Sequence, residues 1–286
     1  MQQEVFTMKQ RTLNGAAITA FAQYLKEQER SAATVEKYLR DVRGFTVFTE
    51  GREVTKELVM EYKTHLIQDG YAVRSVNSML ASVNSLLRFL GWEDCRVKSL
   101  KTQREVYCPE SRELTKTEYL RLLEACKDRP RLNLLLQTVS GTGIRISELR
   151  FFTVEAVRHG EVRVNAKGKS RMILLPSKLK KLLLSYAKRV GIVCGLIFRT
   201  RSGRPLNRSN IWAEMKRLFK AARVEPGKVF PHNLRKLFAR TFYAIEKDIA
   251  KLADLLGHSS IDTTRIYIVS SGQGHRRKLE KMHLVI

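Results

Sequence analysis

Three separate stretches of this chain carry side chains suited to binding or attacking a phosphate group. In the first, Gly141 and Gly143 are expected to end one helix and begin another, which places Arg145 in the first turn of the second helix. The amino end of a helix attracts phosphate, and a guanidinium adds two parallel donors that match two phosphate oxygens. No G-K-[ST] follows, so a nucleotide-binding loop is not favoured. A turn followed by an ordinary surface arginine would give the same pattern.

The second stretch, Pro231 to Arg235, is expected to open a helix. His232 and Arg235 are three positions apart, so they share one helix face and can reach the same anion. Leu234 would then lie on the buried side. A capping histidine beside a surface arginine is the alternative interpretation.

The third stretch, L-L-G-H-S-S-I-D-T-T-R-I-Y, ends at Tyr267. Gly257 is expected to end one helix, and Ser259, with Asp262 three positions further on, to cap the next. His258 would then be held in the gap between two helices, with Tyr267 about two turns later. A tyrosine in an amphipathic helix is ordinarily a core residue, so its position alone does not make Tyr267 a nucleophile.

The charge of the chain predicts an anionic partner. It has 286 residues, with 53 Lys and Arg against 28 Asp and Glu, a formal charge of +25 and a pI near 10.2. Nucleic acid is favoured, because neutralised phosphates release counterions. A membrane surface is the competitor, but the chain has no apolar run of 18 residues and its first residues lack the features of a signal peptide. We therefore expect a cytoplasmic, nucleoid-associated protein without a membrane partner.

The cysteines are scattered and form no C-x-x-C pair, so neither a disulfide framework nor a zinc site is expected. They are Cys95, Cys108, Cys126 and Cys194.

The pattern of apolar residues predicts a mainly α-helical fold in two domains. Residues 1–97 carry four amphipathic helices with apolar residues three or four positions apart, which can bury one shared core as a bundle. Asn14 and Thr55 are candidate caps. Residues 98–112 are polar and basic and are expected to form a linker. Residues 113–286 are expected to form a second, mostly helical domain, which opens on a capping box at Thr115 and Glu118.

A small antiparallel sheet is expected inside the second domain. Three segments alternate apolar and polar residues, and turn sequences separate them. These segments are Thr153 to Val157, Glu161 to Val164 and Arg171 to Leu175, with turns at His159-Gly160 and Lys167-Gly168-Lys169.

The fourth helix of the first domain has a second face made of small and polar residues. Such a face permits close approach to DNA, and an ordinary solvated face would look the same. The residues concerned are Asn77, Ser78, Ser82, Ser85 and Arg88, with Arg74 beside them.

Taken in order, the motifs resemble those of the tyrosine recombinase (phage integrase) family. They are R-[IL]-S-E-L, a lysine at a hairpin tip, H-x-x-R and L-G-H-S-x-x-x-T-T-x-x-Y, and they cover the second domain nearly end to end. The four-helix first domain is similar to the family's core-binding domain. The resemblance implies that Arg145 and Arg235 clamp a DNA phosphate, that His232 and His258 are the two box histidines, and that Tyr267 is the nucleophile.

The hairpin lysine matches the family pattern less closely. The family usually has G-K-G-x-K-x-R, whereas this chain has A-K-G-K-S-R, one residue shorter. Matching the K-G pair selects Lys167, and Lys169 is the other candidate, either as this lysine or as a DNA contact. The resemblance further implies a general-acid role for the lysine, with His232 as candidate base, and cleavage without a metal or other cofactor.

The partners that the resemblance implies are double-stranded recombination sites and a homotetramer on DNA. The residues after Tyr267, through Arg276 and up to Ile286, form a basic tail with an apolar end, which is expected to dock on a neighbouring subunit or, alternatively, to fold back on its own domain. Accessory DNA-bending or directionality proteins are further candidate partners. About a dozen residues precede the first helix, so no additional arm-binding domain is expected.

Two other functions fit part of the sequence. A non-catalytic DNA-binding regulator would share the charge and the helices, but it would not need the five motif residues together. A nicking-closing topoisomerase would share the chemistry, but it would act on single sites as a monomer. The size of the chain and the pattern of its first domain favour recombination.

Overall fold

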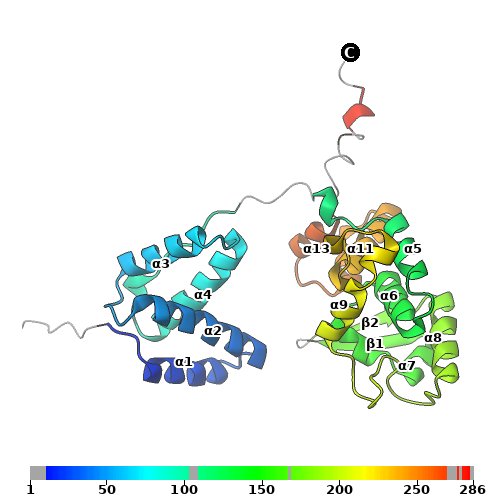
Figure 1. The fold of residues 1–286 in the computed structure, drawn as a ribbon, viewed down its shortest axis with the longest axis horizontal. Helices are drawn as coiled ribbons and strands as arrows, with labels where there is room; N and C mark the ends of the chain where they lie inside the picture. The colour runs from blue at the N-terminus through cyan, green and yellow to red at the C-terminus, as the bar shows by residue number, and fades with distance from the viewer. Residues whose placement is uncertain (1–10, 103–108, 167–168, 269–275, 277–278, 284–286) are drawn as a thin grey trace, which may run out of the picture. The chain divides into compact units, whose positions relative to one another are not determined.

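The computed structural model describes residues 11–102, 109–166, 169–268, 276 and 279–283. The chain divides into two compact units, Met1–Arg104 and Glu105–Ile286 (Figure 1). This division falls inside the segment 98–112 that was predicted to be a linker.

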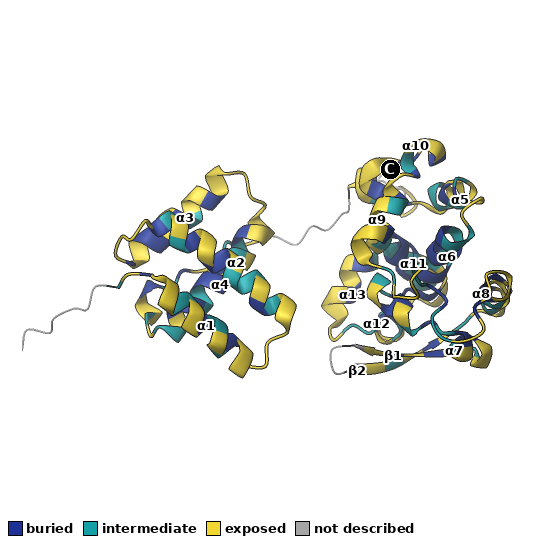
Figure 2. Ribbon diagram, turned by 60° about the horizontal axis from the view of Figure 1, so that its bottom comes forward, coloured by how far each residue is buried: buried dark blue, intermediate teal, exposed yellow. Residues whose placement is uncertain are grey.

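The first unit is a bundle of four helices, as predicted. Asn14, Ser31 and Thr55 accept hydrogen bonds from backbone N–H groups in the first turns of the helices that follow them. The apolar faces meet in one core, seen as the inward dark blue segments in Figure 2. The helices are α1 (Gly15–Glu27), α2 (Ala32–Thr49), α3 (Lys56–Gln68) and α4 (Val73–Phe89), followed by the short 3-10 turn η1 (Glu93–Cys95).

The polar face predicted on α4 is partly internal, which corrects the expectation of an open surface. Ser82 is buried, and its hydroxyl donates to the Asp41 carboxylate of α2 over 3.0 Å. Lys37 lies 2.8 Å from the same carboxylate. Because a buried carboxylate needs such partners, this part of the face holds α2 and α4 together. The sequence could not show this, since the partners lie about 40 positions away.

Asn77 is also engaged within the first unit. Its amide nitrogen donates to the carbonyl of Leu100 over 2.9 Å, and its oxygen accepts from the N–H of Leu100 over 2.7 Å. The side chain of Asn84 makes the same pair of hydrogen bonds with the backbone carbonyl and N–H of Val97. The start of the predicted linker therefore runs along α4, while Arg74, Ser78 and Arg88 remain exposed.

The second unit is mostly helical with one small sheet. The predicted capping box is present, because Thr115 and Glu118 each accept from the other's backbone N–H. The elements are η2 (Glu110–Arg112), α5 (Lys116–Glu124), α6 (Pro130–Thr142), η3 (Ile146–Phe151), α7 (Val154–His159), β1 (Glu161–Ala166), β2 (Lys169–Leu174), α8 (Ser177–Arg189), α9 (Arg208–Lys216), α10 (Phe219–Ala222), η4 (Pro226–Lys228), α11 (Pro231–Glu246), α12 (Ile249–Leu256) and α13 (Ile261–Ile268).

The first of the three predicted strands is wrong. Residues from Val154 form helix α7, and Thr153 caps it by accepting from the N–H of Ala156. Val154 and Val157 are both buried, which fits a helix because they are three positions apart. A run this short, with alternating apolar and polar residues, fits a strand as well as a helix. The hydrogen bond from the Ala156 N–H to the Thr153 hydroxyl favours the helix.

The other two strands form the described sheet, an antiparallel pair. Arg171 pairs with Val164 and Ile173 with Val162, so these four residues lie opposite one another. Val162, Val164 and Ile173 are buried, whereas Met172 and Leu174 face solvent. Strand β2 therefore turns Ile173 and Arg171 to the inner face, since alternate residues share a face.

The beginning of the second unit is bonded to α11. The Asn233 side chain donates to the carbonyl of Arg112 over 3.1 Å and to that of Lys228 over 3.0 Å. About two turns further along α11, Arg240 donates to the carbonyl of Leu114 over 2.6 Å. These bonds tie Arg112, the last residue of the predicted linker, and the start of the predicted second domain to α11.

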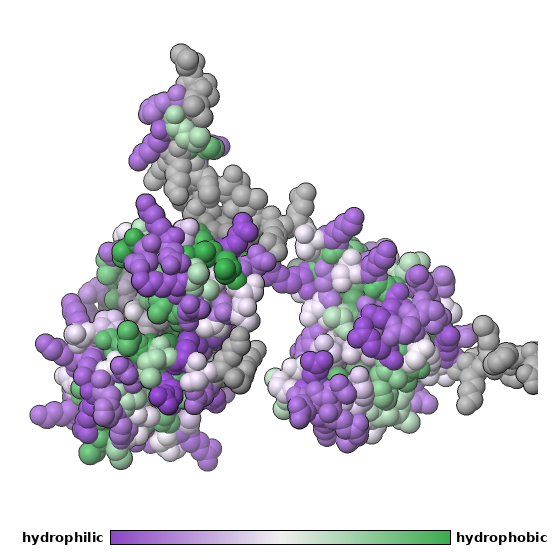
Figure 3. Space-filling view, turned by 180° about the vertical axis from the view of Figure 1, so that it is seen from behind, coloured by the Kyte–Doolittle hydropathy of each residue, from purple (hydrophilic) through white to green (hydrophobic). Residues whose placement is uncertain are grey.

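The surface of each unit is dominated by polar side chains. Figure 3 shows hydrophilic residues over most of the visible face of both units, with hydrophobic ones in scattered patches. Among the described residues, no helix is long and apolar enough to pass through a membrane.

Candidate active site

Gly143 shapes the turn that presents Arg145. It has φ +65°, and a β-carbon added there would collide with the ring of Phe238. Gly141, in contrast, lies inside α6, so only one of the two glycines ends the helix. Arg145 is extended and precedes the 3-10 turn η3, and the prediction that it lies in the first turn of a helix is corrected accordingly.

Arg145 is held from two sides and is still accessible. Its Nη1 donates to Oε1 of Glu148 over 3.1 Å, and its Nη2 donates to the carbonyl of Gly257 over 3.2 Å. Its side chain remains 41% exposed. The guanidinium is therefore fixed in direction yet open to a ligand.

Arg235 lies deeper, on the first turns of α11. It is 1% exposed, and it donates to the carbonyls of Gly143 and Leu256. Burial, followed by the nearby charge of Arg145, lowers the pKa of Arg235 to about 10. The side chain therefore stays cationic at neutral pH, in a place with little water to screen it.

His258 lies between Arg235 and Thr264. Nη2 of Arg235 is 3.0 Å from its Nε2, and the Thr264 hydroxyl is 2.9 Å from its Nδ1. Arginine has only donors, so Nε2 accepts and Nδ1 carries the proton. Burial, followed by the charges of Arg235 and Arg145, lowers the pKa of His258 to about 4.

Tyr267 meets both histidines from α13. Its ring centroid is 4.9 Å from that of His232 and 4.7 Å from that of His258. The guanidinium carbon of Arg235 lies 5.7 Å from the same ring. Helix α13 packs on α11 and α12. Figure 1 shows α13 beside α11, and Tyr267 is 8% exposed. The predicted histidines, buried arginine and tyrosine thus converge.

His232 is exposed on one side and packed against Tyr267 on the other. Partial desolvation, followed by the charges of Lys236 and Arg235, lowers its pKa to about 4. Like His258, it is neutral at pH 7 and has a nitrogen lone pair able to accept a proton.

Glu148 and Arg171 belong to the cluster, although the sequence interpretation did not select them as site residues. Glu148 is 1% exposed, and its two oxygens accept from Nη1 and Nη2 of Arg171 over 3.0 and 2.7 Å. Burial raises its pKa, but the hydrogen bonds from Arg171 and Arg145 outweigh burial and hold the pKa below its usual range. Both residues were within the quoted motifs, R-I-S-E-L and A-K-G-K-S-R, which was the available signal.

The cap of α13 differs from the prediction by one residue. The Ser260 hydroxyl, and not that of Ser259, accepts from the N–H of Asp262 over 3.2 Å. Helix α13 accordingly begins at Ile261.

The predicted hairpin tip and the predicted C-terminal tail lie partly outside the described residues. Lys167 lies outside the described residues, and Lys169 is described only by its backbone pairing with Ala166. Of the tail, Arg276 and residues 279–283 are described, whereas residues 277–278 and 284–286 are not.

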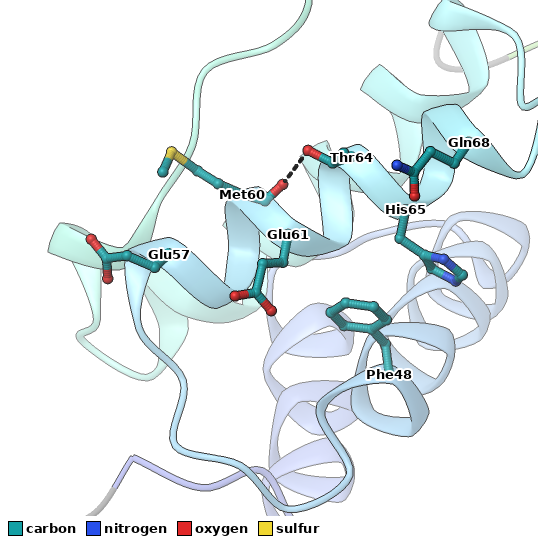
Figure 4. A pocket seen from close by; sticks show the side chains of 7 residues that line it. All are labelled: Phe48, Glu57, Met60, Glu61, Thr64, His65 and Gln68. Carbon is teal, nitrogen blue, oxygen red and sulfur yellow. Dashed lines mark hydrogen bonds between the residues drawn. The ribbon is translucent and has the colours of Figure 1, made fainter.

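A separate surface pocket lies in the first unit, where Phe48 of α2 faces α3 (Figure 4). Its lining includes Glu57 and Glu61, whose carboxylates would repel DNA phosphates. None of the predicted site residues borders it. The remaining lining residues are Met60, Thr64, His65 and Gln68.

Comparison with known families assigns both units. Residues 112–273 match the model of the phage integrase family, and residues 18–94 match the N-terminal SAM-like domain of phage integrases. The first match spans more than half of the chain and contains all six predicted catalytic residues. The chain belongs to the phage integrase family.

Similar proteins match this integrase-family chain over nearly their whole length. Tyrosine recombinase XerA of Pyrococcus furiosus is 28% identical, covering 97% of this chain and 98% of that protein. Tyrosine recombinase XerD of Staphylococcus aureus is 26% identical, covering 93% and 98%. A lambda integrase dimer bound to a core site shares the fold with a TM-score of 0.74 at 18% identity, covering 90% of this chain and 95% of that one. The Tn1549 transposon integrase shares it with a TM-score of 0.71 at 15% identity, covering 94% and 99%.

Within this family member, the cluster combines a fixed cationic surface with a phenol. Arg145 and Arg235 supply donors to an anion, His232 and His258 supply neutral imidazoles, and Tyr267 supplies the hydroxyl. Such a set can bind a phosphodiester and exchange one of its ester bonds for a bond to tyrosine.

Proposed function

We propose that this chain is a site-specific DNA recombinase that cleaves and rejoins strands through a 3′-phosphotyrosine at Tyr267. The observation that carries the proposal is the packing of the Tyr267 ring between His232 and His258, with the Arg235 guanidinium 5.7 Å away. All these groups come from one subunit. Membership of the integrase family and the similarity to named tyrosine recombinases support the same chemistry.

In the forward step, the Tyr267 oxygen bonds to phosphorus and the bond from phosphorus to the 5′ oxygen breaks. Extra negative charge develops on the non-bridging oxygens, where Arg145 and Arg235 supply fixed cations. His232 takes the phenol proton. The bound phosphate adds a negative charge beside this imidazole and so raises its pKa, which makes it a better base than in the free protein.

The departing 5′ oxygen needs a proton, which we assign to the hairpin lysine, with Lys167 ahead of Lys169. The phosphotyrosine keeps the energy of the broken ester. A 5′ hydroxyl of a second duplex then attacks the phosphorus and gives its proton to the neutral lysine, while the protonated His232 returns a proton to the departing Tyr267 oxygen. One ester bond forms as the other breaks, so rejoining needs no ATP.

Double-stranded DNA is the proposed partner. The charge of +25 supports it. We assign residues 1–97 to DNA binding, 98–112 to a linker and 113–286 to catalysis. Arg74, Ser78 and Arg88 are the proposed DNA contacts on α4, while Asn77 acts indirectly, through the backbone of Leu100.

A tetramer on DNA is proposed for the assembled state. One structure similar in fold is a lambda integrase tetramer bound to a Holliday junction, with a TM-score of 0.74. We infer that the basic tail of this chain docks on a neighbouring subunit. Deleting the residues after 275 should abolish synapsis on a native gel while single-site binding persists, and unchanged synapsis would refute the tail's role.

The decisive experiment compares Tyr267→Phe with Tyr186→Phe. Tyr186 lies on α8. In both ribbon views α8 and α13 lie on opposite sides of the second unit (Figures 1 and 2). The Tyr267 variant should bind DNA normally and form no covalent adduct on a denaturing gel, whereas the Tyr186 variant should form it. An adduct with Tyr267→Phe would overturn the proposal.

The wild-type protein should also exchange strands between two cognate duplexes. Relaxation of supercoiled DNA without strand exchange would instead identify a topoisomerase. The DNA recovered from the trapped adduct would give the sequence of the cleavage site.

A further inference from the structure

One buried carboxylate connects the β1–β2 hairpin to the phosphate-facing arginine. Glu148 accepts two hydrogen bonds from Arg171 of β2 and a third from the side chain of Arg145. It also accepts from the backbone N–H of Arg145 over 2.7 Å. The hairpin and the Arg145 turn are therefore joined through a single side chain.

Arg171 also lies against the turn that carries His258. A β-carbon added at Gly257 would stand 2.7 Å from Nη1 of Arg171, so a side chain there would displace the guanidinium from its present place. The carbonyl of Gly257 accepts from Arg145 on the same turn. Three segments that are far apart in sequence thus meet at Arg171.

Arg171 is placed to hold the hairpin against Glu148 and not to bind a phosphate. Its side chain is 14% exposed, and both terminal nitrogens are bonded to Glu148. Its Nε is buried and has no hydrogen-bond partner among the described residues. To bind a phosphate, Arg171 would have to release Glu148 and leave a buried carboxylate poorly paired, which is costly.

The hairpin needs such an anchor because two strands alone are marginally stable. Val162 and Ile173 hold the end of the hairpin near α7 by apolar burial, and Val164, which pairs with Arg171, is buried beside them. Towards the tip, Arg171 takes the inner position where an apolar residue would otherwise stand. Its ion pair with Glu148 attaches the hairpin to the Arg145 turn. The pair also fixes the orientation of strand β2, because a guanidinium and a carboxylate with two parallel hydrogen bonds lie in one plane.

We propose that Arg171 is a positioning residue that orients the hairpin, and with it the lysine that protonates the departing 5′ oxygen, against the phosphate held by Arg145. This inference rests on the proposed function. Arg171 itself touches no reacting atom. Its loss should therefore impair leaving-group protonation selectively, while Arg145 keeps its bonds to Glu148 and Gly257.

The test compares DNA with an ordinary phosphate and DNA with sulfur in place of the bridging 5′ oxygen. A thiolate leaves without protonation, so the modified substrate bypasses the general acid. We expect Arg171→Gln to cleave ordinary DNA roughly 10- to 100-fold more slowly than wild type. This loss is smaller than the ~100- to 10,000-fold contribution of a general acid, because the lysine is misplaced and not removed. On the sulfur substrate its rate should return to the wild-type value. Arg163→Gln, an exposed arginine on β1 of the same hairpin, is the matched control and should cleave both substrates normally.

The outcomes separate three cases. A loss that persists on the sulfur substrate would mean that Arg171 acts through Arg145 or through the fold, and normal cleavage of ordinary DNA would mean that it has no positioning role. Either result overturns the inference. Failure of the wild-type protein to form an adduct with either substrate would instead overturn the proposed function.

A second variant keeps the test informative if Arg171→Gln does not fold. Arg171→Lys keeps the charge next to Glu148 but loses the paired bonds, and it should show the same sulfur rescue with a smaller defect. In a background lacking both Lys167 and Lys169, either substitution should add no further loss on ordinary DNA, because residues acting on one step are not additive. An added loss would contradict the assignment.

Discussion

Arg235 holds His258 in its neutral form, because Nη2 of the guanidinium donates a hydrogen bond to Nε2 of the imidazole over 3.0 Å. The imidazole can accept this bond only while Nε2 is unprotonated. Protonation would place two cations in contact inside a buried site. The structure therefore ties the stability of the second unit to the protonation of a histidine.

Stability should fall in mild acid for this reason. The pKa of His258 is about 4 in the folded protein, against an ordinary value near 6.5, so the unfolded chain binds more protons between these values. The contribution of His258 is complete above about pH 6.5 and is lost as the pH falls towards 4. His232, with a folded pKa also about 4, adds to the same slope. Urea unfolding between pH 7 and 4 measures it.

Replacing His258 by Gln should make this pH slope shallower, since glutamine can keep both hydrogen bonds without titrating there. His159→Gln provides the control, because His159 is exposed at the end of α7. Equal slopes for the His258 variant and the wild type would contradict the assignment of the shift to this residue.

Arg145→Lys should reduce cleavage by roughly 100-fold or more, the size of effect seen when one fixed donor to a developing charge is lost. Lysine keeps the charge but cannot donate to Glu148, Gly257 and a phosphate in one plane. DNA affinity should change little, because bulk charge is unchanged. Parallel binding and single-turnover cleavage assays measure the difference, and near-normal cleavage would argue for a simple electrostatic patch.

Gly143→Ala should destabilise the protein more than its backbone angle alone explains. The left-handed conformation costs about 1–2 kcal/mol for alanine, and the collision with Phe238 adds about 1–3 kcal/mol of overpacking. Gly191→Ala is the matched control, because Gly191 has φ +69° and open space around it. Denaturant unfolding of both variants should therefore separate the packing cost, and equal losses would show that Phe238 moves aside freely.

Thr264→Val should destabilise the protein by about 1–3 kcal/mol, the cost of a buried donor without a partner. The donor is the Nδ1–H of His258, which bonds the Thr264 hydroxyl over 2.9 Å. Thr263→Val, at an exposed neighbouring position, should change stability by less than about 0.5 kcal/mol. Comparable effects of the two substitutions would mean that the hydroxyl does not orient the imidazole.

Local signals in the sequence were enough to select most of the side chains that the structure brings together in the candidate site. Caps, glycines and fixed spacings predicted the helix ends at Asn14, Thr115 and Gly257, and the motifs identified Arg235, His258 and Tyr267. Such features depend on residues within a turn or two of each other, so a single chain displays them.

Features that depend on distant partners were missed or misjudged. The pairing of Glu148 with Arg171 joins residues 23 positions apart, and the Ser82–Asp41 bond joins residues 41 apart. Nothing in the local pattern tells a serine on a solvated face from one bonded to a buried carboxylate. At Thr153 the difficulty was different, since six residues fit a short helix and a strand equally well.

The bonds from Asn233 to Arg112 and from Arg240 to Leu114 give the covalent tether between the units a defined point of attachment. Asn233 is the neighbour of His232 on α11. A force applied to the chain at Arg112 would therefore act directly on the helix that carries His232 and Arg235. The residues that enter the second unit and two side chains of the candidate site would thus respond together to a pull on the chain.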